Sequence, residues 1–141
     1  MRRLSLIALV LVLFAGACEQ QAAPEALAPQ APGAPVTGVI TLSQAASVEP
    51  GNVLYIIARK SESGPPAAVK RIADPRFPLA FELGPKDSMV PGIEFTGPLS
   101  IKARLSRSGD AMPRAGDIEG VYPEPVEPGQ SGIEILLAQV R

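Results

Sequence analysis

The 141-residue chain contains no histidine, the side chain that enzymes use most often as a general base and that metals and haem bind most often. Without histidine, neither a Ser-His-Asp triad nor a Cys-His pair can form. The chain also lacks a Gly-x-Ser-x-Gly nucleophile motif, a Ser-x-x-Lys pair and a phosphate-binding glycine loop. We therefore expect a protein that is not an enzyme and that uses no metal or other cofactor.

Aromatic residues and basic runs are also scarce. The chain has no tryptophan and only four phenylalanines, so isoleucine, leucine and valine must supply most of any core. Thirteen basic residues stand against 14 acidic ones, and the basic residues form no block. This balance argues against nucleic acid or an anionic lipid surface as a partner.

Cysteine occurs once, as Cys18, so no disulfide within the chain can support the fold. Two arginines, an apolar run over residues 4–14 and the small residues 15–17 precede it. A basic start, a short apolar core and small residues before a cleavage point are the three regions of a secretory signal. The apolar run is shorter than the roughly 20 residues that cross a bilayer, so we expect residues 1–17 to be a signal peptide and not an anchor.

A cysteine directly after the small-residue triplet resembles the lipobox of bacterial lipoproteins. The resemblance implies that Cys18 is lipidated after cleavage and that lipid anchors the protein to a membrane. Glu19 follows, where an aspartate would favour retention in the inner membrane, so we expect the outer membrane, facing the periplasm. The alternative is ordinary signal cleavage that leaves Cys18 as a buried or free thiol.

Residues 18–35 are rich in alanine, proline, glutamine and glutamate. Prolines at positions 24, 29, 32 and 35 oppose a helix, and the segment has almost no apolar surface to bury. We expect a disordered tether that carries a single folded domain, residues 36–141, away from the membrane.

The sequence pattern of residues 36–141 predicts strands separated by turns. Strands are expected at residues 36–42, 53–58, 67–72, 77–83, 99–106 and 133–140, with the segment 53–58 central because it is apolar on both faces. The clearest alternation lies in 99–106, where it predicts Lys102 and Arg104 on a solvated face. Short strands with turn signals about every ten residues predict an all-β, antiparallel sandwich of about seven strands.

Asp117 and Glu119 form the one carboxylate pair close enough to weigh as a cation site. The plainer interpretation is that Asp117 caps a turn after Gly116 and that Glu119 is solvated.

A longer pattern carries a family resemblance. Residues 103–113 and 115–120 resemble a stretch of CcmI/CycH-type cytochrome c biogenesis proteins, and so do segments 50–59, 65–71, 77–79 and 87–92. The resemblance implies an Ig-like periplasmic β-domain. It also implies apocytochrome c or other cytochrome maturation components as partners. The family's membrane helices and tetratricopeptide repeats have no counterpart in the pattern of this sequence.

We expect partner binding at two loops that would border the sandwich. The candidate residues are Met89, Pro91, Gly92, Ser108, Gly109, Asp110, Met112 and Pro113. Glycine beside aspartate favours tight turns, and methionine offers adaptable apolar contact, although either methionine could instead fill the core. The predicted function is a membrane-anchored, protein-binding accessory module of cytochrome c biogenesis. The alternative is a structural or small-ligand-binding envelope lipoprotein unrelated to haem.

Overall fold

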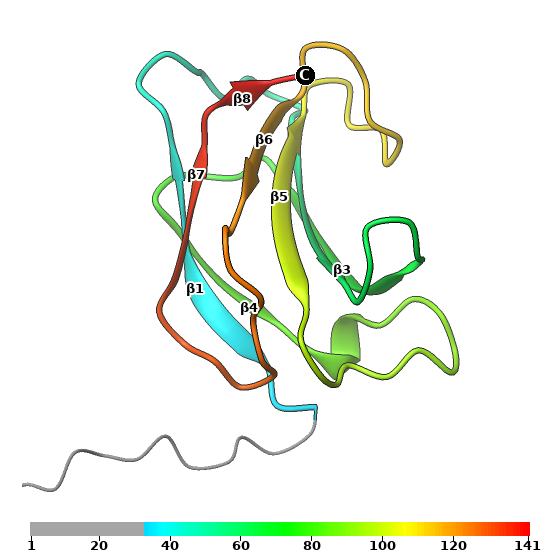
Figure 1. Cartoon of the computed structure of the whole chain (residues 1–141). Helices are drawn as coiled ribbons and strands as arrows, with labels where there is room; N and C mark the ends of the chain where they lie inside the picture. Colours follow the sequence, from blue (N-terminus) through cyan, green and yellow to red (C-terminus); the bar gives the residue numbers. More distant parts are fainter. Residues whose placement is uncertain (1–32) are drawn as a thin grey trace, which may run out of the picture.

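The computed structural model describes residues 33–141, which form two β-sheets packed face to face (Figure 1). The smaller sheet has the order β4-β1-β7, with β1 at Val36–Leu42, β4 at Leu79–Leu83 and β7 at Ile133–Leu137. The larger sheet has the order β3-β2-β5-β6-β8, with β2 at Val53–Arg59, β3 at Pro66–Ala73, β5 at Ser100–Ser106, β6 at Ile118–Val121 and β8 at Gln139–Val140. One short 3-10 helix, η1 at Pro85–Asp87, follows β4. The expected Ig-like β-sandwich is confirmed.

The core lies between the sheets and follows the period-two pattern of the strands. Ile101, Ala103 and Leu105 of β5 are almost wholly buried there, as are Leu54, Ile56 and Ala58 of β2. The smaller sheet contributes residues such as Ile40, Leu83 and Ile135. The aliphatic composition expected from the sequence therefore does form the core, with phenylalanines in a minor share.

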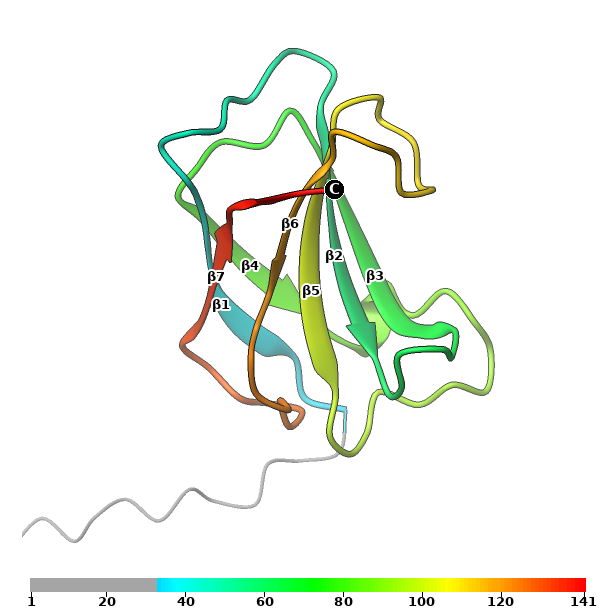
Figure 2. The same cartoon turned by 45° about the horizontal axis from the view of Figure 1, so that its top comes forward.

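Strand β2 has the central place expected from its continuous apolar run, since β3 and β5 pair with its two edges (Figure 2). Two details differ from expectation. The pairing of β1 with β7 is parallel, so the smaller sheet is mixed. The expected last strand breaks at Ala138, which leaves β7 beside β1 in one sheet and β8 beside β6 in the other.

Strand β6 was not expected, because four residues that include a glutamate and a glycine give little strand signal. The glycine has a packing reason. A Cβ on Gly120 would lie 2.3 Å from the carbonyl oxygen of Leu136, so the backbones of β6 and β7 approach too closely for any other residue. Gly120 therefore faces the smaller sheet, and its neighbours Glu119 and Val121 point to the opposite face of β6.

The predicted signal peptide, Cys18 and nearly all of the predicted tether lie outside the described residues. Within residues 33–141, no helix has the length and apolar character needed to cross a bilayer.

Candidate functional site

The face of the larger sheet that points away from the core carries the grooves of interest, and we call it the outer face. The pairing register places four rows of side chains across it, and the outermost row holds Pro66, Arg59 and Ser100. Val69, Ile57, Lys102 and Val121 form one row, and Arg71, Tyr55, Arg104 and Glu119 form the next. Val53 and Ser106 belong to the third. The rows mix apolar side chains with cations, which is unusual for a simple solvated face.

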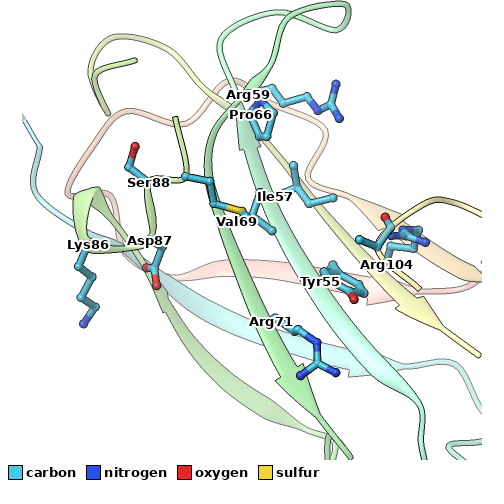
Figure 3. Close-up of a pocket in the computed structure, with 12 residues that line it drawn as sticks. Tyr55, Ile57, Arg59, Pro66, Val69, Arg71, Lys86, Asp87, Ser88 and Arg104 are labelled. Carbon is cyan, nitrogen blue, oxygen red and sulfur yellow. The ribbon is translucent and has the colours of Figure 1, made fainter. Parts of the chain in front are cut away.

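One groove on this face, the β2–β3 groove, has a volume of about 570 Å³ (Figure 3). Its floor is formed by Tyr55, Ile57 and Val69 of the two strands. Segments from outside the sheet complete it, with Ser88 and Met89 from the loop after η1 and Ala111 from the β5–β6 loop. Both loops that the sequence nominated therefore reach the same groove.

A second hollow, the β5–β6 groove, has a volume of about 500 Å³. It is lined by polar strand residues such as Lys102 and Glu119 and by Met112 and Pro113 of the β5–β6 loop. Ile57, Arg59, Arg104 and Ala111 line both grooves, so the two hollows adjoin along β2 and β5.

Arg104 lies at the boundary between the grooves, and its side chain is only 2% exposed. Its Nη1 donates to Oδ2 of Asp117 at 2.6 Å and to the carbonyl of Met112 at 3.2 Å, while Nη2 donates to the carbonyl of Ala111. The guanidinium also lies 5.1 Å from the centroid of the Tyr55 ring, within cation–π range. Arg104 is therefore a buried structural cation, which corrects the expectation that it lies on a solvated face.

Asp117 is the partner that makes this burial tolerable. Burial raises the pKa of Asp117, but the backbone N–H of Arg114, the Arg104 guanidinium and the backbone N–H of Arg107 together hold that pKa below its ordinary value. The two backbone donors lie 3.0 and 3.2 Å from the carboxylate oxygens. A carboxylate with this set of donors stays ionised and fixes both ends of the loop between β5 and β6.

The β5–β6 loop, residues 107–117, is thus fastened over the outer face. In addition to the Arg104 contacts, the Tyr55 hydroxyl donates to the carbonyl of Gly109 at 2.9 Å, and the Asn52 side-chain amide donates to the carbonyl of Arg107 at 3.3 Å. Figures 1 and 2 show this yellow-to-orange segment extending from the end of β5. We refer to the Arg104, Asp117 and Tyr55 contacts as the loop latch.

Glu119 is also paired, contrary to the expectation that it is solvated. Its two carboxylate oxygens accept from Lys102 at 2.7 Å and from Arg141 at 2.9 Å, and its side chain is 13% exposed. Burial raises the pKa of Glu119, and these two cations outweigh that effect and lower it. Asp117 and Glu119 therefore each hold their own cations, and among residues 33–141 no three potential metal ligands come together.

The first candidate loop is exposed, but its members separate. The Met89 side chain is 69% exposed and borders the β2–β3 groove, so Met89 does not fill the core. Gly92 has a positive φ of 85° and lines a different hollow, beside Lys60 and Pro65. Pro91 is exposed between them and lines none of the grooves described above.

The second candidate loop has one part that is hydrogen-bonded to the rest of the domain and another part whose side chains are exposed. Gly109 accepts the Tyr55 hydroxyl, and Asp110 pairs with Arg114 while its N–H faces the Ser108 hydroxyl at 3.4 Å. Met112 is 73% exposed, and together with Pro113 it lines the β5–β6 groove. The sequence did not indicate Arg104, Tyr55 or Ile57 as site residues, because each occupies an ordinary strand position.

The fold and these grooves define an Ig-like β-sandwich with a loop fastened across one sheet. Residues 36–137 match the family described as the cytochrome c-type biogenesis protein H Ig-like domain. The chain belongs to this family, as the resemblance read from its sequence indicated.

Two further similarities accompany the family match. An uncharacterized protein of Aquifex aeolicus is 33% identical over 87 residues, which cover 62% of this chain and 57% of that protein. The matched part thus spans little more than half of the relative's length. A solved structure of an alternative pilotin from the type II secretion system of Vibrio cholerae is 12% identical, covers 74% of this chain and 96% of its own, and superposes with a TM-score of 0.47.

Proposed function

We propose that the protein is a non-catalytic, lipid-anchored module of the periplasm that binds polypeptide during c-type cytochrome biogenesis. The observation that carries this proposal is the β2–β3 groove, which two loops border in a domain of the cytochrome c-type biogenesis protein H Ig-like family. Family membership supports the biological setting, and the groove supports the kind of contact.

The groove suits an apolar segment of an unfolded or partly folded chain. Its strand floor is rich in apolar carbon, and Met89 stands exposed at its border. Methionine side chains are unbranched and polarizable, so they adapt to partners of varied shape. Met112, at the adjoining β5–β6 groove, extends the same kind of surface. Apocytochrome segments with apolar helix faces would bury these side chains without needing a tightly shaped pocket.

The anchoring part of the proposal rests on the sequence alone. Lipidation at Cys18 would hold the domain at the outer membrane, facing the periplasm, and the tether would let it reach membrane-associated partners. Several acyl chains hold a protein firmly, because each buried methylene contributes about 0.8 kcal/mol.

A second candidate function is favoured by the size of the groove. A volume of about 570 Å³ falls in the range of small-ligand sites. An envelope lipoprotein that binds a small apolar ligand unrelated to haem therefore remains the alternative, and the experiment below separates the two.

The test is a titration of the protein from Gln20 to Arg141 with apocytochrome c segments and, separately, with haem. We expect the segments to bind and haem to bind weakly, since no histidine is present to ligate it. The paired change Met89→Ser and Met112→Ser should weaken segment binding severalfold. The matched control is Leu136→Ser, which removes a 56% exposed apolar side chain from the smaller sheet.

Two results would contradict the proposal. Binding of haem without binding of the segments would overturn the assignment of polypeptide as the ligand. Binding of neither would favour the small-ligand alternative.

A further inference from the structure

The β2–β3 groove carries positive charge that this chain does not neutralise. Arg71 is exposed, and its side chain makes no hydrogen bond or ion pair within residues 33–141. Arg59 donates to the carbonyls of Glu62 and Gly64, at 3.3 and 3.1 Å, and so has no carboxylate partner in the described part of the chain. A protein with a net charge of −1 therefore presents, at one groove, two guanidinium charges that no carboxylate of residues 33–141 neutralises.

The other charged groups that line the groove are already paired. Lys86 bonds to Glu82, and Arg104 bonds to Asp117. The Asp87 carboxylate accepts from the backbone N–H of Gly84 at 3.0 Å and lies 3.8 Å from Lys70. Arg59 and Arg71 are thus the groups in this groove that an incoming carboxylate would meet.

These two arginines lie at opposite ends of an apolar floor. Figure 3 shows Ile57 and Val69 between them. Arg71 pairs across the sheet with Tyr55, and Tyr55 is four residues from Arg59 along β2. At about 3.3 Å per residue, the backbone positions of the two arginines are separated by about 13 Å along the strand direction.

The groove favours a helical occupant over an extended one. Both edges of β2 are already paired, with β3 and β5, and the unpaired edge of the larger sheet, at β3, lies beside the floor, so a strand laid over the floor itself would meet no free backbone groups. A peptide strand on a sheet face would leave its backbone N–H and C=O groups without partners, whereas a helix satisfies its own. About eight residues of a helix, a little over two turns, span about 12 Å, because each residue rises about 1.5 Å. This span is close to the separation of Arg59 and Arg71 along the strand.

We propose that the β2–β3 groove docks an amphipathic helix whose apolar stripe is flanked by two carboxylates about eight residues apart, which pair with Arg59 and Arg71. The inference rests on the proposed polypeptide-binding function and adds the shape and charge of the segment that is recognised. Carboxylate and guanidinium form paired hydrogen bonds, so the arginines would select acidic segments and also fix their position along the groove.

The test uses a synthetic, alanine-rich amphipathic helix of about 16 residues with a leucine stripe and two glutamates about eight positions apart. A second peptide carries glutamine at both positions. Binding to the protein from Gln20 to Arg141 is measured by calorimetry for wild type, Arg71→Gln and Arg76→Gln. Arg76 is an exposed arginine outside the groove and serves as the matched control.

We expect Arg71→Gln to weaken binding of the glutamate peptide about two- to fivefold, the range of a partly exposed ion pair. It should leave the glutamine peptide unaffected, and Arg76→Gln should leave both unaffected. Equal binding of the two peptides by wild type, or equal losses for the two arginine variants, would overturn the charge recognition. If apocytochrome segments bind while neither helix does, the helical docking is wrong and the proposed function stands. If the segments fail as well, the proposed function itself fails.

Discussion

The loop latch makes a strong prediction for Asp117→Asn. This change removes the negative charge that faces Arg104 while keeping the size of the side chain. The Arg104 side chain is 2% exposed, so its guanidinium would remain buried with carbonyl partners alone. The amide would also keep one acceptor oxygen in place of two, although Arg104, Arg107 and Arg114 all donate to this carboxylate.

The expected loss is large compared with the stability of a small domain. Removing one member of a buried ion pair costs about 3–5 kcal/mol, because the remaining charge is desolvated without compensation. Domains of this size are stable by about 5–15 kcal/mol, so the variant should stay folded but lose a considerable fraction of that free energy. At about 4 °C or more per kcal/mol, the thermal midpoint should fall by at least about 12 °C.

The assay is thermal unfolding, together with urea unfolding, each followed by circular dichroism, with Glu82→Gln as the control. Glu82 and Lys86 form an ion pair in which both side chains are well exposed, so its removal should leave the midpoint unchanged within error. A second set of variants introduces Arg104→Met into the wild type and into Asp117→Asn. The double variant should be less destabilised than the two single losses together, since the two groups interact directly. Equal midpoints for Asp117→Asn and wild type would refute the idea of a desolvated pair.

Two further predictions follow from the acidic residues and from the single cysteine. Because the folded-state pKa values of Asp117 and Glu119 lie below their ordinary values, the stability they contribute is present above about pH 4 and is lost as the pH falls through the folded-state values. Urea midpoints measured from pH 7 to pH 3 should therefore decline, and less steeply in Asp117→Asn; a midpoint that rises toward pH 3 would contradict the assignment. Separately, Cys18→Ala should abolish palmitate labelling and shift the full-length protein into the aqueous phase of a detergent separation. Wild type that is already aqueous would show that the lipobox interpretation is wrong.

The sandwich could be predicted from the sequence because its strands carry the signals on which such prediction depends. The continuous apolar run of β2 indicated a strand paired on both sides, and the alternation in β5 placed Ile101, Ala103 and Leu105 in the core. What the pattern could not supply was pairing between distant segments. The parallel contact of β1 with β7 joins opposite ends of the domain. Strand β6 depends on its neighbours for its conformation, since four residues carry too little periodicity.

The candidate site shows the same division between local and distant information. The turn residues and the methionines were enough to predict both loops as candidate binding loops. In the structure, Met89 and Met112 border grooves on the outer face. The binding role of these residues stays a prediction. Alternation alone assigned Arg104 to a solvated face, because a period of two distinguishes only the two sides of a sheet. It cannot reveal that a later segment of the chain returns to cover one of those sides.

That covering segment explains how one loop can combine order with adaptable contact. Its buried elements, Asp117 and the carbonyl of Gly109, face the sheet and bind Arg104 and Tyr55. The exposed side chains of Met112 and Pro113 lie between these two points and line a groove. A loop fixed at its ends loses less conformational entropy when a partner binds, because much of that entropy was lost during folding. Substitutions at the latch should therefore act mainly on stability, and substitutions at the exposed methionines mainly on binding.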